Sequence, residues 1–106
     1  MTTSSEGKSR TPYTLEFAEA AKKEWDNLDP IIRKQFATKL KERLVQPEVA
    51  ADRLSGMPGC YKIKQRASGF RLVYEVINDR VVVLVLAVGK RERKKVYAAA
   101  AKRLNS

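Results

Sequence analysis

The order of apolar and polar positions in the first half of the chain predicts one strand followed by two helices. Apolar residues alternate with polar ones over 13–18, as they do in a half-buried strand. Over 17–28, and again over 32–44, apolar residues recur every three or four positions, which predicts two helices with one apolar stripe each. Asp29–Pro30 suits the start of the second helix, and Pro47 requires its end. The link between the helices is short, so we expect them to pack as a hairpin.

The second half of the chain predicts three strands and a final helix. Ser68–Gly69 and Asn78–Asp79 suit tight two-residue turns between antiparallel strands. Residues 81–88, VVVLVLAV, show no alternation, so this strand should lie inside a sheet with both faces covered. Residues 47–59 predict a loop with one helical turn. The expected elements are strands at 60–66, 70–77 and 80–88 and a basic, alanine-rich helix at 90–104.

This order, β-α-α-β-β-β-α, predicts an α+β fold in which a small, antiparallel-rich sheet packs against an N-terminal helical hairpin. The length of 106 residues suits a single domain, which we place at residues 11–106, after a polar tail at 1–10 that we expect to be disordered. The chain shows no signal-peptide pattern and no apolar run long enough to span a bilayer. We therefore expect a cytoplasmic protein that does not contact membranes.

The first predicted turn determines which side chains share a face of the sheet. With Ser68–Gly69 as the whole loop, the directly opposed pairs are Arg66 with Arg71, Lys64 with Val73 and Lys62 with Glu75. Directly opposed residues point to the same side of a sheet, so the cations of the hairpin share one face. These cations are Lys62, Lys64, Arg66 and Arg71. The residues expected to face the helices are Tyr61, Ile63, Phe70, Leu72, Tyr74 and Val76.

The second predicted turn brings a distant basic segment to the same place. With Asn78–Asp79 as its loop, Arg71 lies opposite Leu86, and the strand leaves through Gly89 near the first turn. We therefore expect the segment that follows, GKRERKKVY, to extend the cationic face. The residues that it would add are Lys90, Arg91, Arg93 and Tyr97.

The charge of the chain indicates a polyanionic partner. The net charge is +10, and residues 60–106 carry 12 Lys and Arg against 3 Asp and Glu, whereas residues 1–59 carry 10 against 9. A concentrated positive field attracts polyanions, of which nucleic acid is the commonest. Like charges directly opposite one another also destabilise a sheet, so a cluster kept against that cost indicates a bound anion. The alternatives are a solvated face, partly neutralised by Glu75 and Asp79, or a surface covered by an acidic partner protein.

The residue types limit the chemistry that such a face can perform. The chain has no histidine and one cysteine, Cys60, which argues against a zinc or iron–sulfur site and removes the usual acid–base catalyst. RNA cleavage needs a base for the ribose 2′-hydroxyl, cations for the phosphate and an acid for the leaving 5′-oxygen. Cationic neighbours lower the pKa of a lysine or a tyrosine, and arginine clamps a phosphate bidentately. The composition therefore permits RNA cleavage without histidine or metal.

Two stretches of the second half resemble the RelE toxins of bacterial toxin–antitoxin pairs. They are LSGMPGCYKIKQRASGFRLVYEV, which contains the KIK and GFRLVY motifs, and VVVLVLAVGKRERKKVY, which contains the GKRER…VY motif. The likeness extends from about Tyr13 to Leu104 and keeps the spacing between the three motifs. The chain departs from the family pattern in its extension at 1–10 and in small changes such as Gln65 and Phe70.

The resemblance implies an endoribonuclease that needs no metal or cofactor, enters the ribosomal A site and cuts messenger RNA there by attack of the 2′-hydroxyl. The residues that match the family's catalytic positions are Lys62, Lys64, Arg71, Arg91 and Tyr97. By likeness, Lys62, Arg71 and Arg91 hold the scissile phosphate. Either Lys64 or Tyr97 is the general base, Tyr97 is also placed to stack on a nucleobase, and Arg91 is a candidate proton donor. The cations expected to bind or attract RNA around this site are Arg66, Lys90, Arg93, Lys94, Lys95, Lys102 and Arg103.

The resemblance also implies the partners of the protein. They are messenger RNA, the ribosome with the 16S rRNA of its A site, and a RelB-like antitoxin that covers or displaces the C-terminal helix. Toxin and antitoxin together would repress their own promoter, so operator DNA would be bound only through the complex. Two other functions stay open: a toxin of the same fold that inhibits DNA gyrase, and a nucleic-acid-binding corepressor without catalysis.

Overall fold

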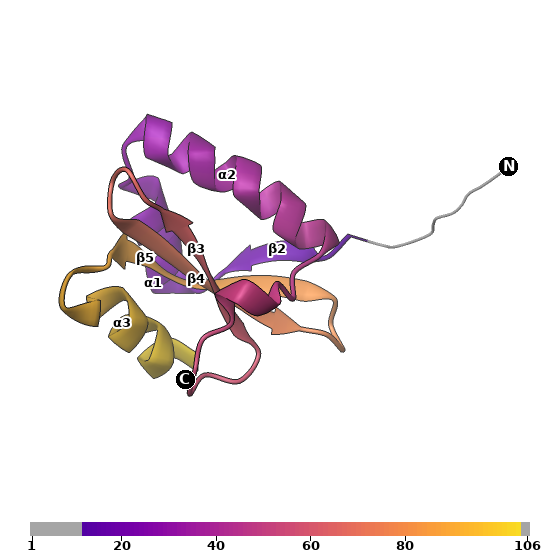
Figure 1. The fold of residues 1–106 in the computed structure, drawn as a ribbon. Coiled ribbons are helices and arrows are strands. Elements are labelled where there is room, and N and C mark those ends of the chain that lie inside the picture. Colours follow the sequence, from indigo (N-terminus) through magenta and orange to yellow (C-terminus); the bar gives the residue numbers. More distant parts are fainter. Residues whose placement is uncertain (1–11, 105–106) are drawn as a thin grey trace, which may run out of the picture.

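The computed structural model describes residues 12–104 and has the predicted α+β fold and element order (Figure 1). The tail expected at residues 1–10 lies outside the described residues. The elements are β2 (Thr14–Phe17), α1 (Glu19–Asp26), α2 (Pro30–Val45), the 3-10 helix η1 (Ala50–Asp52), β3 (Cys60–Gln65), β4 (Phe70–Ile77), β5 (Val82–Lys90), the 3-10 helix η2 (Glu92–Lys94) and α3 (Lys95–Leu104). Asp29 accepts a hydrogen bond from the amide of Ile31 (2.9 Å) and so caps α2 as its sequence predicts.

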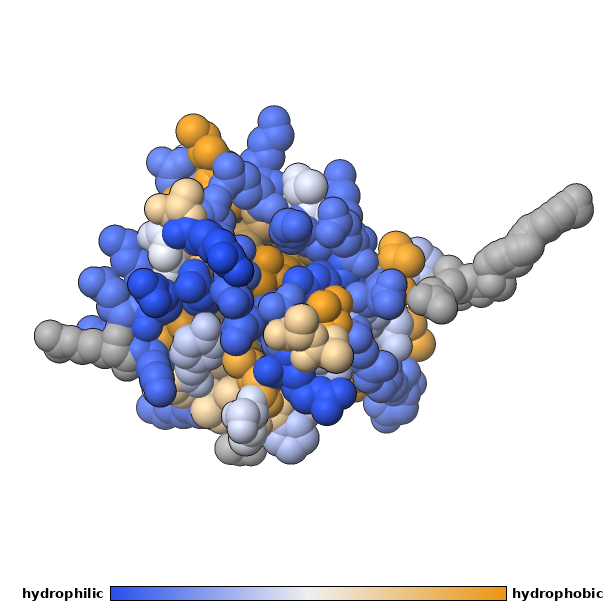
Figure 2. Space-filling model, in the orientation of Figure 1, coloured by the Kyte–Doolittle hydropathy of each residue, from blue (hydrophilic) through white to orange (hydrophobic). Residues whose placement is uncertain are grey.

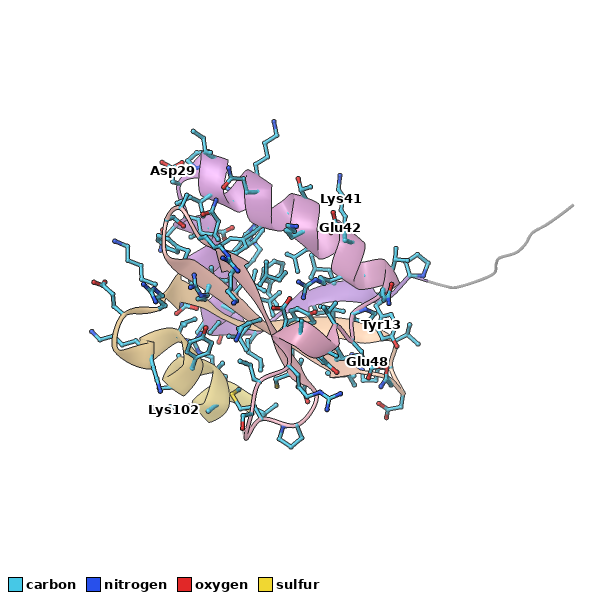
Figure 3. The ribbon with its side chains drawn as sticks, in the orientation of Figure 1. Tyr13, Asp29, Lys41, Glu42, Glu48 and Lys102 are labelled. Atoms are coloured by element: carbon cyan, nitrogen blue, oxygen red, sulfur yellow. The ribbon has the colours of Figure 1, made fainter. Side chains whose placement is uncertain are left out.

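The four strands form one mixed sheet in the order β2-β5-β4-β3. β2 runs parallel to β5, whereas β4 is antiparallel to both of its neighbours, β5 and β3. Helices α1 and α2 cover one face and α3 covers the other (Figure 1), and Figure 3 shows Asp29 at the start of α2 and Lys102 on α3 at opposite sides of the sheet. The prediction of an interior strand covered on both faces is confirmed for β5. Within residues 12–104, no helix is both long and apolar enough to span a membrane.

Each face of the sheet has its own hydrophobic core. The first core, under α1 and α2, consists of Ala21, Leu28, Phe36, Leu40, Tyr61, Ile63, Leu72, Tyr74, Val76, Val83, Val85 and Val88. The second core, under α3, consists of Met57, Cys60, Val73, Leu86, Ala87, Val96 and Ala100. The six residues of β3 and β4 that were expected to face the helices all lie in the first core or, for Phe70, pack against it.

The first hairpin has a four-residue loop, residues 66–69, where the sequence predicts two. The observed pairs are Gln65 with Phe70, Lys64 with Arg71, Lys62 with Val73 and Cys60 with Glu75. A two-residue turn needs positive φ at its first position, but here only the second residue, Gly69, has it (77°). Ser68 closes a wider loop instead, because its Oγ donates to the carbonyl of Gln65 (3.2 Å) and accepts from the amide of Phe70 (3.1 Å).

The predicted pairing of the first hairpin is therefore wrong by two residues. Arg66 does not oppose Arg71 but lies in the loop, and Lys64 takes its place as the partner of Arg71. Side chains alternate between the faces with a period of two, so an even shift leaves each one on its predicted side. The prediction that Lys62, Lys64 and Arg71 share a face is confirmed.

The second hairpin also has a four-residue loop, residues 78–81, so β5 begins at Val82 and continues through Gly89 to Lys90. A β-bulge then adds one residue to β5, because Tyr74 pairs with Val85 while Val73 pairs with Ala87. Arg71 consequently lies opposite Gly89, and the predicted pairing of Arg71 with Leu86 is wrong.

The bulge also explains the apolar run of β5. Leu86 and Ala87 are consecutive residues, yet both belong to the second core, whereas Val85 and Val88 on either side belong to the first. A strand that buries both faces and contains a bulge shows no period of two, which is the pattern that its sequence has.

A polar network joins α2 to the first core. The Arg43 guanidinium donates to the Tyr74 hydroxyl (2.8 Å), to the Asp52 carboxylate (2.6 Å) and to the carbonyl of Lys62 (3.4 Å). The Tyr74 hydroxyl in turn donates to the carbonyl of Pro47 (2.7 Å). Burial raises the pKa of the Tyr74 phenol, and the adjacent guanidinium opposes that rise. The network provides partners for the buried Tyr74 hydroxyl, so we expect it to contribute to stability.

We predict that Arg43→Met lowers the free energy of unfolding by about 1–3 kcal/mol, because Asp52 and the Tyr74 hydroxyl lose their donor in a partly buried site. Urea unfolding followed by circular dichroism measures this change. The matched control is Arg80→Met, whose ion pair with Glu16 is longer (3.4 Å) and exposed, and which should change stability by less than about 1 kcal/mol. Equal losses in the two variants would contradict the prediction.

Candidate functional site

Cations and apolar residues share the face of the sheet that α3 covers. On this face, Cys60 and Val73 belong to the second core, and Lys62, Lys64 and Arg71 continue the same face towards the first loop. Lys64 and Arg71 lie directly opposite each other on β3 and β4. The alternation of the two strands therefore places a row of cations beside a packed apolar layer.

Lys64 and Arg71 line a hollow of about 330 Å³ at the end of the sheet. Its described lining residues are Lys64, Arg66, Gly69, Arg71 and Arg91. Among these described residues are four cations and no carboxylate, and they come from β3, the first loop, β4 and the segment after β5. Figure 2 shows hydrophilic residues over the part of the sheet between α2 and α3. Two segments twenty residues apart in the sequence thus meet in one cationic hollow, as their sequence predicts.

The backbone fixes Arg91 beside the first loop. The amide of Arg91 donates to the carbonyl of Gly69 (3.0 Å), and the carbonyl of Arg91 accepts from the amide of Lys94 (2.9 Å). The chain then turns through η2 into α3, with Lys94 at a φ of 56°. The sequence marks Gly69 only as a turn residue, and its role as the attachment point of Arg91 was missed because it depends on the observed register.

Arg71 is the most enclosed of the cations, with only 9% of its surface exposed. Its Nη1 donates to the carbonyl of the adjacent residue, Phe70 (3.0 Å), and it makes no ion pair with a carboxylate anywhere in residues 12–104. A guanidinium held in place without a counterion, beside Lys64, creates a strong local attraction for an anion. The planar fork of arginine suits a phosphate in particular.

The other predicted catalytic residues, Lys62 and Tyr97, are not among the described residues that line the hollow. Lys62 is half-buried on the same face as Lys64 and directly opposes Val73 of the second core. Tyr97, on α3, is half-buried and packs against that core. Lys62 and Tyr97 thus both lie beside residues of the second core.

The residues expected to bind RNA divide into three groups. Arg66 lines the hollow, and Lys94 at the end of η2 and Lys95 at the start of α3 are exposed. Lys90 pairs with Phe70 and its Nζ lies 5.8 Å from the centre of that ring, so its side chain is on the opposite face from Lys64, and the prediction that Lys90 extends the cationic face is wrong. The side chain of Arg93 lies outside the part of the structure that is described.

Arg103 makes a contact that its sequence position does not indicate. It was expected to be a cation that attracts RNA, but its guanidinium forms an ion pair with Glu24 of α1 (2.8 Å). The partner lies 79 positions away in the sequence, so no local pattern indicates this contact.

Cys60 has no role in this chemistry. Its side chain is fully buried in the second core, and burial, with a smaller contribution from Glu75, raises the pKa of its thiol to about 11. The thiolate that would react is therefore scarce near neutral pH. Cys60 thus acts as a small hydrophobic residue at the start of β3.

Comparison with known proteins identifies the family. The family model described as the ParE toxin of the type II toxin–antitoxin system parDE matches residues 15–95. The mRNA interferase toxin RelE of Escherichia coli (strain K12) is 54% identical over 92 residues, which are 87% of this chain and 97% of that protein. The mRNA interferase RelE of Shigella flexneri gives the same values.

Solved structures agree with the sequence comparison. A mutant of E. coli toxin RelE in the free state matches with a TM-score of 0.82 at 52% identity, over 88% of this chain and 98% of that chain. RelE in the intact E. coli RelBE toxin–antitoxin complex matches with a TM-score of 0.74 at 54% identity, over 76% of this chain and 99% of that chain.

The fold, the cationic hollow and these matches together define a toxin of a bacterial toxin–antitoxin system. The chain belongs to the RelE/ParE family of such toxins, and within that family it is of the RelE type. The resemblance stated from the KIK, GFRLVY and GKRER…VY motifs is confirmed.

We predict that Lys64→Gln raises the free energy of unfolding by about 0.2–1 kcal/mol at low ionic strength, because it removes a like charge directly opposite Arg71. The gain should shrink as salt screens the remaining cations. Urea unfolding at two salt concentrations measures both effects. Lys41→Gln, at an exposed position on α2 (Figure 3), is the matched control and should change stability little. If Lys64→Gln lowered the free energy of unfolding and Lys41→Gln did not, repulsion between Lys64 and Arg71 would not be destabilising the fold.

Proposed function

We propose that this toxin is an endoribonuclease that cuts messenger RNA in the ribosomal A site. One observation carries the proposal: among the residues that the structure describes, four cations and no carboxylate line one hollow, with Lys64 directly opposite a buried Arg71. The names of the relatives support the substrate, since the E. coli and Shigella flexneri proteins that are 54% identical to this chain are mRNA interferases.

The hollow suits the phosphate at the point of cleavage. Charge grows on the phosphate oxygens as the 2′-oxygen attacks, and fixed cations stabilise that charge without having to reorganise. In the proposed complex, Arg71 clamps the oxygens bidentately, Arg91 approaches from the segment after β5, and Lys62 neutralises from the adjacent row. The enclosed position of Arg71 favours this role, because a guanidinium away from bulk water interacts more strongly with an anion.

The reaction needs two proton transfers. A base takes the proton of the 2′-hydroxyl, the O2′–P bond forms and the P–O5′ bond breaks, and an acid protonates the leaving 5′-oxygen. The products are a 2′,3′-cyclic phosphate and a free 5′-hydroxyl. We assign the base to Lys64 or Tyr97 and the acid to Arg91, and no step requires a metal or a cofactor. Tyr97 would also stack on a nucleobase of the codon.

The proposed partners follow from the same relatives. E. coli RelE, 54% identical, has been solved in complex with its antitoxin, and we propose a RelB-like antitoxin for this chain. We also propose that Arg66, Lys90, Arg93, Lys94 and Lys95 contact messenger RNA or 16S rRNA in the cytoplasm. Operator DNA would be bound only by the toxin–antitoxin complex.

We predict that the purified toxin cuts messenger RNA on ribosomes stalled with an empty A site, and that primer extension maps the cuts to the A-site codon. Tyr97→Phe should lower the cleavage rate by about a hundredfold or more if the phenol transfers a proton. Arg71→Gln should do the same by removing the phosphate clamp. Naked RNA should stay intact.

The control for this experiment is Lys34→Gln, an exposed change on α2 that keeps the hollow intact. It should cut at the rate of the unchanged toxin. Intact RNA in every lane, with protein shown to be folded, would refute the proposal. A gyrase supercoiling assay would then test the alternative of a gyrase inhibitor, and binding of RNA without cleavage would favour the corepressor.

A further inference from the structure

Within residues 12–104, part of β5 has no neighbouring strand on the side of β2. β2 pairs with β5 only from Thr14–Val82 to Phe17–Val85, and the last backbone contact on this side joins the amide of Ala18 to the carbonyl of Val85 (2.9 Å). The bulge and the end of β5 extend beyond that point. Their outward backbone groups need other partners, because an unpaired polar group in a protected site is costly.

Glu24 and Arg103 supply those partners. Glu24 Oε1 accepts from the amide of Val88 (3.0 Å), and Arg103 Nη1 donates to the carbonyl of Leu86 (2.9 Å). The two side chains also bind each other through both arms of the guanidinium, at 2.8 and 3.1 Å. Both are mostly shielded, with 33% of Glu24 and 24% of Arg103 exposed. This bidentate, charge-assisted contact is of the strong and directional kind.

The pair joins the helices of opposite faces around the edge of the sheet. Glu24 lies on α1, which packs in the first core, and Arg103 lies on α3, which covers the second. It also holds both of them to β5 at the bulge, close to the point where the chain leaves for Arg91. The contact therefore fixes α3 relative to the strand that leads into the cationic hollow.

The apolar face of α3 consists largely of small side chains. The helix contains four consecutive alanines at 98–101; it contributes Val96 and Ala100 to the buried second core, and Tyr97, Ala99, Ala101 and Leu104 pack against that core. Alanine buries little area and has no long side chain to interlock with its neighbours. A directional ion pair near the end of the helix therefore adds a constraint on its rotation and on its position along the sheet to the packing of Val96, Tyr97 and Leu104.

We propose that Glu24 and Arg103 are positioning residues that hold Tyr97 against the cationic face through α3. The inference rests on the proposed function, in which Tyr97 contacts the RNA. Tyr97 lies on the same short helix as Arg103 and packs against the core that contains Val73, the direct partner of Lys62. We call the Glu24–Arg103 ion pair, together with its hydrogen bonds to β5, the latch. If the latch breaks, α3 moves and Tyr97 leaves its place, while Lys64, Arg71 and Arg91 stay on the sheet and its loops.

The first test measures the latch without any RNA. Hydrogen exchange of the amides is compared between the unchanged toxin and Glu24→Gln, with Arg103→Gln as a second variant in case either one folds poorly. We expect the amides of α3 and of Val88 to exchange about tenfold faster or more, while those of β3 and β4 keep their protection. Asp26→Asn is the matched control, since its ion pair with Lys22 lies on the same helix but is exposed and should leave α3 unchanged. Unchanged exchange of α3 in both latch variants would overturn the inference.

The second test asks whether the latch acts through Tyr97. Single-turnover cleavage on ribosomes is measured for Glu24→Gln, Tyr97→Phe and the double variant, over several ribosome concentrations and with long incubations for the slow variants. We expect Glu24→Gln to lower the maximal rate about tenfold and to leave the half-saturating concentration almost unchanged. In the Tyr97→Phe background the same substitution should cost less than about twofold, because coupled residues are not additive. Arg103→Lys keeps the charge but loses the fork, so it should restore part of the rate that Arg103→Gln loses.

The outcomes separate the latch from the proposed function. Suppose that the latch variants speed hydrogen exchange of α3, but that the effect of Glu24→Gln on the cleavage rate is fully additive with that of Tyr97→Phe. This result would refute the positioning role, and the latch would then be a structural contact only. An unchanged toxin that cuts no RNA would refute the proposed function, and the exchange of α3 would still decide whether the latch exists.

Discussion

The alternation of side chains along β3 and β4 is the constraint on which the candidate site depends. It sends Tyr61, Ile63 and Tyr74 into the first core and places Lys62, Lys64 and Arg71 together on the other face. A one-residue slip would exchange these sets and bury the cations under α2, at a cost of several kcal/mol for each unpaired charge. Burial of the first core therefore fixes the register between β3 and β4, and this register keeps the cations next to one another. Their mutual repulsion is tolerated because the apolar residues on the opposite face cannot move without exposing themselves to water.

Repulsion among the cations of this face destabilises the fold, and packing in the second core offsets that cost. Apolar residues such as Cys60 and Val73 occupy the same face a short distance along the strands, and α3 packs over them. The site is thus built at the border between a packed layer and an open hollow. That position gives Arg71 a rigid, shielded setting and leaves Lys64 and Arg91 exposed to an incoming phosphate. A polyanion that binds only the folded state would relieve the repulsion and stabilise the protein by mass action.

The sequence predicted the element order, the α+β class, both faces of the first hairpin and the meeting of Arg91 with the Lys64–Arg71 region. These features follow from local periodicity and from turns, which short stretches of sequence encode. The predicted strand register was wrong for two reasons. The lengths of the loops depend on the hydrogen bonds of Ser68 and on the positive φ of Val81, and a bulge at Leu86 does not change the pattern of an all-apolar strand. The pairing of Glu24 with Arg103 was missed, since it joins residues that only the complete fold brings together. The roles of Lys64, Arg91 and Tyr97 in proton transfer rest on chemistry and family likeness, because side-chain placement alone does not distinguish a base from a clamp.

The central claim is that the cationic hollow stabilises a phosphate while the neighbouring 2′-oxygen attacks it. The most direct measurement compares two ribosome-bound messenger RNAs that differ only in one 2′-hydroxyl, at the nucleotide on the 5′ side of the mapped cut. We predict that the 2′-deoxy message binds but is not cleaved at that position, and that the normal message leaves a 2′,3′-cyclic phosphate on its upstream fragment. Cleavage of the 2′-deoxy message at an unchanged rate, or an upstream fragment that ends in a 3′-hydroxyl, would contradict the account.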